Sequence, residues 1–196
     1  MSRQHGITAE TYERLVIDAG AVYKDYVSAE DPGTLLGATR GGSVFAVETE
    51  FREMPVDGAK GPVKGDKRIV KVTASLECNF IESTSEIYKR MLPGSSASGY
   101  PAEAATHDEI RRTNDVSAAD YLANVTIVGQ VSGSLEPVVL MVENAMSDGK
   151  LSISLADNDE AVNKIKFIGH FDPDVLIVEP WRIRFPQDVN PTTEGA

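Results

Sequence analysis

The chain has 196 residues, of which 41% are hydrophobic, which is typical of one domain with a packed core. Its formal net charge of −11 argues against a protein whose task is to bind DNA tightly, because phosphate contacts need clustered Lys and Arg. The single cysteine, Cys78, excludes an internal disulfide framework and a thiolate metal cluster. No apolar run approaches the roughly 20 residues that span a bilayer, and the first residues lack the apolar core of a signal peptide, so we expect a cytosolic protein with no membrane partner.

Two alternating segments in the first half predict a pair of strands. Over residues 70–80 the even positions are apolar and the odd ones polar, which places Cys78 on a buried face. Residues 45–51 repeat the alternation, with Phe45 and Phe51 on the apolar face. The two strands predict a hairpin whose connection, of about fifteen residues, is far longer than the usual two to five.

This connection, at about residues 53–68, contains the stretch VDGAKGPVKGDKRI. It does not match a phosphate-binding loop, because Gly65 is followed by Asp66 and then by a strand. No aromatic residues alternate with its lysines, which disfavours nucleic acid binding. It therefore predicts a basic arm that becomes ordered against another chain, with a partnerless exposed loop as the alternative. The candidate contact residues are Asp57, Gly58, Lys60, Gly61, Lys64, Gly65 and Lys67.

A single helix is predicted after the hairpin, with Ser83 as N-cap and Glu86 completing a capping box, before Pro93 and Gly94 end it. Residues 94–117 show little periodicity and predict an irregular surface excursion. Further strands are expected at 123–131, 138–142, 151–155, 164–171, 175–178 and 181–185. We expect a mainly β fold, a β-sandwich or barrel with one flanking α-helix and a long protruding hairpin loop, forming one domain over 1–186 with a flexible tail at 187–196.

The titratable and nucleophilic residues match no known pattern of a catalytic or metal-binding site. His170, Asp172 and Asp174 have side chains that could form a metal site, but Pro173 makes this segment typical of a turn. Ser43 lies outside a nucleophile elbow, and Trp181 is more typical of a core side chain than of a ligand-stacking one. We therefore expect no catalytic residues, no cofactor and no metal.

Several blocks, in order along the chain, resemble the tail tube (major tail) proteins of long-tailed bacteriophages, specifically the family common in phages and prophages of Gram-positive hosts. The most specific are LLGATRGG and VDGAKGPVKG, and LECNFIE, ANVTIVG and FIGHFDPD support them. The resemblance covers residues 18–181. The excursion at 94–117 and the polar tail depart from it.

The resemblance implies a structural virion protein without catalytic activity. Hexameric rings would stack into a hollow tube through which genome DNA passes without specific binding, and the arm would reach a neighbouring ring. It also implies the tape measure, tail tip and terminator proteins as partners, and a location in the virion tail after assembly in the host cytoplasm. Tailocins, gene transfer agents and other tube systems share this architecture.

Acidic side chains facing such a lumen would repel DNA phosphates, and Glu48, Glu50 and Glu77 are the candidates because they occupy polar strand faces. The alternative function is a non-catalytic β-sandwich module that binds a carbohydrate or host surface. Such a module predicts clustered exposed aromatic residues. Aromatic content is only 7%, and five phenylalanines are expected on buried faces: Phe45, Phe51, Phe80, Phe167 and Phe171.

Overall fold

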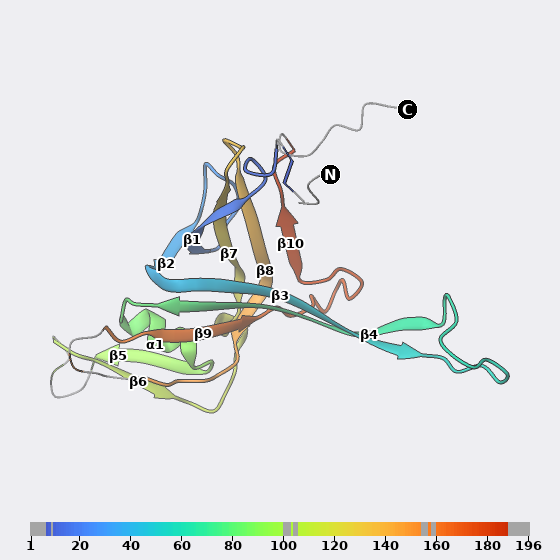
Figure 1. Ribbon diagram of the computed structural model, residues 1–196. Coiled ribbons are helices and arrows are strands. Elements are labelled where there is room, and N and C mark those ends of the chain that lie inside the picture. The colour runs from blue at the N-terminus through green and yellow to red at the C-terminus, as the bar shows by residue number, and fades with distance from the viewer. Residues whose placement is uncertain are drawn as a thin grey trace.

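The computed structural model describes residues 7–8, 10–99, 103, 106–153, 157 and 160–187. These residues form a mainly β fold with one α-helix, as predicted (Figure 1). The helix, α1, spans Ser85–Met91. The strands are β1 (Val16–Lys24), β2 (Thr34–Gly37), β3 (Thr39–Glu53), β4 (Lys67–Phe80), β5 (Ser95–Gly99), β6 (Asp108–Arg112), β7 (Leu122–Val131), β8 (Pro137–Ser147), β9 (Asn163–Ile168) and β10 (Trp181–Arg184).

One large antiparallel sheet organises the chain, in the order β2-β1-β7-β8-β9-β4-β3, and β10 pairs with β8 as a branch. β8 is the strand that joins the two halves. Most of its length pairs with β7, whereas only Met146 and Ser147 at its end pair with β9. The sheet therefore changes direction along β8, and its two halves enclose a core.

The main core draws on both halves of the sheet and on α1, which gives the fold its sandwich-like character. Its buried members come from β1, β4, α1, β7, β8 and β9, and are Val22, Leu76, Cys78, Phe80, Ile87, Met91, Leu122, Val125, Ile127, Val142, Ala145, Ile165 and Phe167. Burial of apolar area on this scale is the main stabilising contribution in a fold with so little helix.

The predicted β3–β4 hairpin is confirmed. Its ladder runs from the pair of Thr39 with Phe80 out to the pair of Glu53 with Lys67, and residues 54–66 connect the strands. The predicted alternation on β4 holds from residue 76 to 80, where Leu76, Cys78 and Phe80 are buried and the residues between them are half-buried. Ser75, expected on the polar face, is buried next to Ala74. Residues 67–71 are exposed on both faces, and residues 72 and 73 are half-buried.

Helix α1 begins one residue later than expected. Thr84 is the N-cap, and its hydroxyl accepts a hydrogen bond from the Ile87 N–H at 3.2 Å. The predicted cap, Ser83, instead accepts a bond from Asn163 Nδ2 at 3.0 Å. Glu86 does not complete a capping box, because Ile87 and not Glu86 lies three residues after the N-cap. The Glu86 carboxylate pairs instead with Lys24 and Arg90 at 3.4 and 2.9 Å and so ties the helix to β1.

The expectation of an irregular excursion at 94–117 was wrong, because β5 and β6 form a hairpin within it. Most of its described residues are exposed, so no buried face imposes the period of two that makes a strand visible in a sequence. The hairpin is anchored at its base, where Asp120 accepts hydrogen bonds from the Gly94 and Ser117 N–H groups, each at 2.8 Å.

Two predicted strands are absent from the described residues. Residues 151–153 are not in a strand, and 154 and 155 lie outside those residues. Residues 175–178 form turns, with the Val175 N–H bonded to the Asp172 carbonyl at 3.1 Å and the Val178 N–H to that of Val175 at 3.3 Å. Local turn bonding next to Pro173 overrides the β-propensity of this aliphatic run.

Strands β1 and β2 were not anticipated. The alternation in β1 is broken where its register against β7 shifts between Ile17 and Ala21. Gly20 lies in this irregularity with φ at 71°, and a Cβ there would come within 2.7 Å of Ile127 Cγ2. The glycine is therefore required by both its backbone conformation and its close approach to β7. The predicted flexible tail lies outside the described residues apart from Gln187.

Burial makes Cys78 a test of the predicted strand register. Its side chain is fully buried, and burial raises the pKa of its thiol to about 12. We expect Cys78→Ser to lower the free energy of unfolding by about 1 kcal/mol or more, because a hydroxyl replaces an apolar group in the core. Chemical denaturation measures this change. Rapid reaction of the native protein with a thiol reagent would contradict the assigned burial.

Asp120 predicts an acid-sensitive contribution to stability. Burial by itself raises the pKa of its carboxyl, but bonds from the Ser117 and Gly94 N–H groups outweigh this effect and hold that pKa below its ordinary value. Since the folded-state pKa is the lower one, the contribution is complete above the unfolded-state pKa and is lost as pH falls through the folded-state pKa.

Asp120→Ala should therefore cost about 1 kcal/mol at neutral pH, and the difference from the unsubstituted protein should vanish in acid. Denaturation at a series of pH values measures it. Asp115→Ala removes an exposed carboxylate from the same loop and is the control. A cost independent of pH would show that the carboxylate charge plays no part.

Candidate functional site: the protruding hairpin

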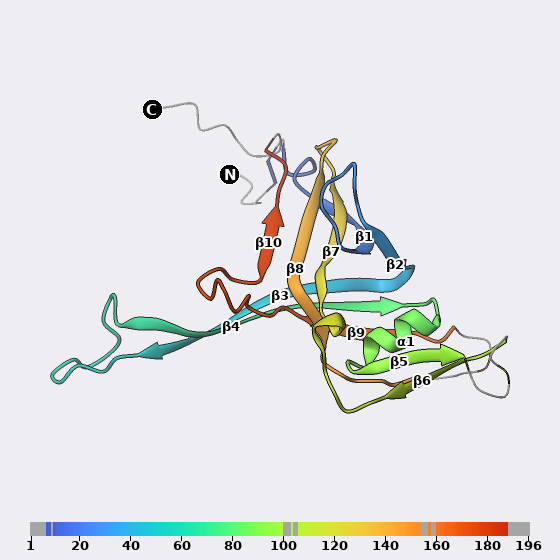
Figure 2. The ribbon, with the colours of Figure 1, turned by 180° about the vertical axis from the view of Figure 1, so that it is seen from behind.

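The outer part of the β3–β4 hairpin extends far beyond the body of the molecule (Figures 1 and 2). We call residues 48–71 the arm and residues 54–66 its tip. Every arm residue is exposed apart from the half-buried Asp66. The ladder remains paired out to Glu53 and Lys67, so the arm is a two-stranded ribbon with an ordered base.

The tip has its own hydrogen bonds. The Met54 N–H bonds to the Asp66 carbonyl at 3.1 Å, and Asp66 Oδ2 accepts a bond from the Val63 N–H at 2.9 Å. Gly58 and Gly65 have φ angles of 89° and 95°, in the region that favours glycine. The backbone conformation of the tip therefore favours glycine at these two positions, whereas Gly61 lies outside that region.

The apolar face of the hairpin continues from the core into the arm. Phe45 makes an edge-to-face contact with Trp181, with ring centroids 6.5 Å apart. Further out, Phe51 and Ile69 are paired across the ladder, and they are 56% and 58% exposed. Phe51 is on the predicted face, but the expectation that it is buried was wrong. The tip adds exposed Met54, Val56 and Val63.

The charges of the arm are only partly satisfied within the chain. Lys67 pairs with Glu53 at 3.4 Å and Lys71 with Glu50 at 3.2 Å. Lys60 and Lys64 make no ion pair to any residue in the described ranges, and Asp57 is also exposed at the tip. The tip therefore presents two lysines next to exposed aliphatic side chains.

The three lumen candidates lie on one face of the sheet. In the β3–β4 ladder, Glu48 pairs with Thr73, Glu50 with Lys71 and Glu77 with Val44. This register places the three glutamates on the face of the sheet opposite the core. Two of the three are neutralised by cations, Glu50 by Lys71 and Glu77 by Lys164 at 2.7 Å. Lys166 lies on the same face, opposite Glu77 in the ladder. This face therefore carries paired charges and is not an acidic surface.

His170 and Trp181, the other residues considered as possible ligand or metal contacts, interact with neighbouring protein groups. His170 Nδ1 lies 3.1 Å from the Asn144 carbonyl, and its ring contacts Tyr121 edge-on. The described residues contain no group of three His, Cys, Asp or Glu side chains placed to hold a metal ion. Trp181 is half-buried, and its Nε1–H donates to Glu179 Oε2 at 2.6 Å. Among the described helices, none is long and apolar enough to cross a membrane.

The exposed aromatic residues of the described chain come from separate elements. Tyr12 lies in the turn before β1, Phe51 in β3, Tyr121 before β7 and Phe185 after β10. Two aromatic contacts occur among the described residues, of Phe45 with Trp181 and of Tyr121 with His170, and neither joins two of these exposed rings. This distribution does not favour the aromatic platform that a carbohydrate-binding module would use.

A scan against protein-family models finds no match to this chain, and a search of curated proteins finds no relative. The tail-tube resemblance is therefore a hypothesis from the sequence blocks alone.

The exposure of the arm predicts that its apolar residues do not stabilise the monomer. Replacing Phe51 and Ile69 together by Thr should change the free energy of unfolding by at most about 1 kcal/mol, since only their cross-strand contact is lost. Leu76→Ala, further along the same ladder in the core, should cost about 2–5 kcal/mol. A loss of similar size in both variants, measured by denaturation, would contradict an uncovered arm.

Proposed function

We propose that the protein is a structural subunit that polymerises, as stacked hexameric rings, into the hollow tail tube of a long-tailed bacteriophage. The observation that carries this proposal is the arm: an ordered ribbon, projecting from the body, whose apolar side chains are left uncovered by its own chain. The resemblance of the sequence blocks supplies the kind of assembly.

Uncovered apolar surface of this kind favours association. Phe51, Val56 and Ile69 are each more than half exposed. Burying their apolar area against a second copy would stabilise the association of the two copies. Contacts between unlike surfaces of identical subunits generate a ring when the rotation closes and a filament when it does not. An arm that leaves its own subunit can make such a contact, within a ring or between rings.

The sheet also offers strand edges for lateral contacts. β2 and β3 lie at the two ends of the strand order, and β10 pairs with β8 as a branch. An unpaired edge is an aggregation hazard in a monomer, and pairing between neighbouring subunits satisfies its backbone groups. Ring formation would therefore convert these edges into part of the assembly.

We further propose that Glu48, Glu50 and Glu77 face the lumen. The observed pairing with Lys71 and Lys164 suits a passage in which DNA makes no lasting contact, because lysines held in ion pairs are less free to bind phosphates. Glu48 has no ion pair among the described residues and supplies a repulsive charge. The partners are other copies of the chain and the tape measure, tip and terminator proteins.

Deleting residues 57–66 tests the proposal. The remaining connection, residues 54–56, is of a length that β-hairpins use, so the body should still fold. We expect a folded monomer that forms no tubes, because the contacts of the tip are gone. Negative-stain electron microscopy of the concentrated protein across salt concentrations, with circular dichroism for folding, makes the measurement.

An Asp115→Ala variant is the control, since this exposed residue lies after β6, outside the arm and outside the strands at the sheet edges. It should assemble as the unsubstituted protein does. Tubes of normal diameter from the deletion variant would refute the role of the arm. An unsubstituted protein that never forms rings or tubes would count against the tube itself.

A further inference from the structure

We propose that the arm tip of one copy docks in a corner of the next copy, formed between the loop at residues 172–178 and the apolar face of that copy's own arm. We call this corner the receiving surface: the loop together with Phe51 and Ile69. The inference rests on the proposed function, and it names the surface that the arm contacts.

The loop exposes an uninterrupted aliphatic run. Val175, Leu176, Ile177 and Val178 are 44%, 67%, 93% and 50% exposed. Val175 and Val178 also line a hollow in the surface together with Pro180. Four consecutive aliphatic side chains with this exposure are typical of a contact surface.

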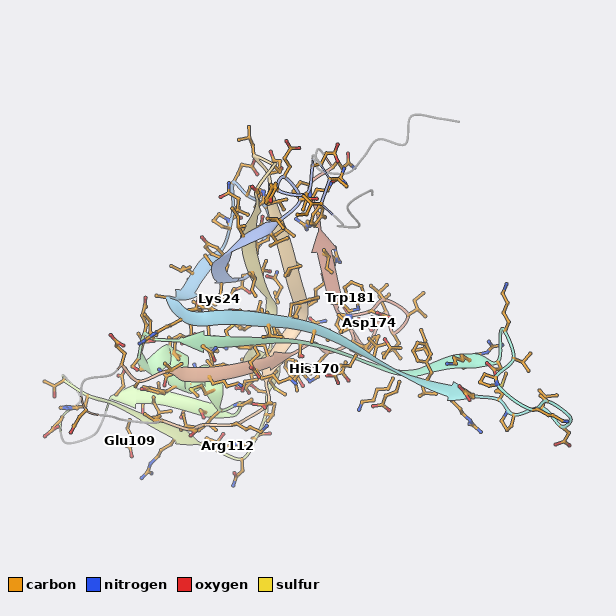
Figure 3. The ribbon with its side chains drawn as sticks, in the orientation of Figure 1. Lys24, Glu109, Arg112, His170, Asp174 and Trp181 are labelled. Carbon is orange, nitrogen blue, oxygen red and sulfur yellow. The ribbon has the colours of Figure 1, made fainter. Side chains whose placement is uncertain are left out.

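The loop and the arm share one side of the hairpin. The backbone that leads into the loop is bonded to β4, with the Gly169 N–H donating to the Ala74 carbonyl at 2.9 Å. The backbone that leaves it places Trp181 against Phe45 on the apolar face. Phe51 and Ile69 lie further out on this face, and Figure 3 shows Asp174 and Trp181 near the point where the arm leaves the body.

The tip cannot reach the 172–178 loop of its own chain, because that loop lies at the base of the arm. β3 and β4 stay paired out to Glu53 and Lys67, so about 20 Å of ribbon separates the tip from Val47 at its base. A second copy has to supply the tip, and the contact joins two different surfaces of identical chains. Repeating it from copy to copy gives the head-to-tail arrangement from which a closed ring or a stack is built.

The charged residues of the loop and of the tip indicate that the tip is the segment that binds the receiving surface. The loop carries Asp172 and Asp174, and neither makes an ion pair with a described residue. The tip carries Lys60 and Lys64, which are also without ion pairs in the described ranges, beside exposed Val63. Each surface thus combines aliphatic side chains with charged ones, and the two tip lysines are opposite in sign to Asp172 and Asp174. The tip also contains Asp57 and Asp66, of which Asp66 accepts a hydrogen bond from the Val63 N–H within the tip. Complementary charges of this kind set orientation and partner choice.

Cysteine cross-linking tests the contact directly. A Val63→Cys/Ile177→Cys variant should form a ladder of disulfide-linked multimers on a non-reducing gel after mild oxidation, since every copy carries one thiol for each neighbour. A mixture of the two single variants should stop at dimers. Buried Cys78 should stay out of the reaction. Val63→Cys/Leu135→Cys is the control, because Leu135 is fully exposed in the turn between β7 and β8.

A ladder in the first variant and none in the control supports the inference. Tubes or rings by electron microscopy without a ladder would overturn it and leave the proposed function standing. If neither a ladder nor assembled particles of the unsubstituted protein form across salt concentrations, both are overturned.

Charge reversal supplies an independent test. Lys64→Glu and Asp174→Lys should each raise the protein concentration needed for assembly by about three- to tenfold, and the double variant should recover most of the loss. Lys64→Glu/Asp31→Lys has the same net charge as that double variant but places the new lysine in the exposed loop before β2, so it should not recover. Equal recovery by both would show an effect of net charge alone and would overturn the pairing.

Discussion

Backbone pairing between β3 and β4 begins in the core and ends in solvent, and the rest of the molecule is arranged around this ladder. At its inner end, Leu76, Cys78 and Phe80 form the centre of the main apolar cluster. At its outer end the same ladder holds the arm in a defined direction. A flexible loop of equal length would lose much more conformational entropy on binding a second copy, whereas a ribbon anchored in the core is already ordered at its base.

The two halves of the sheet make this anchoring strong. β8 pairs with β7 and β10 along most of its length and with β9 at its end, so the core receives side chains from both directions. Helix α1 closes the core with Ile87 and Met91 and is tied to β1 through Glu86. The arm is therefore anchored in a packed body, which suits the proposed role as a polymer subunit.

The distribution of charge follows a consistent pattern. Acids and lysines on the solvent face of β3, β4 and β9 largely pair within the chain, as do Glu50 with Lys71 and Glu77 with Lys164. The lysines of the tip and the aspartates of the 172–178 loop are without such partners among the described residues. Unpaired charges beside exposed aliphatic residues mark the surfaces proposed to meet between copies, and paired charges mark the face proposed to meet DNA.

The sequence by itself determined the features that local periodicity and turn chemistry control. The alternation at 70–80 predicted which residues of β4 share a face, the length and glycines of the connection predicted the protruding hairpin, and the pattern before Pro93 predicted α1 to within a residue of its cap. The sequence did not determine which residues are buried. Phe45 and Phe51 have the same pattern, yet only Phe45 contacts Trp181, because a partner strand far along the chain covers one position and stops short of the other. For the same reason residues 175–178 resembled a strand until the turn bonds of Asp172 and Val175 were known, and β5 and β6 had no buried face to reveal them. Which apolar residues are covered, and therefore where a second copy could bind, is decided by contacts between distant segments that only the tertiary structure brings together.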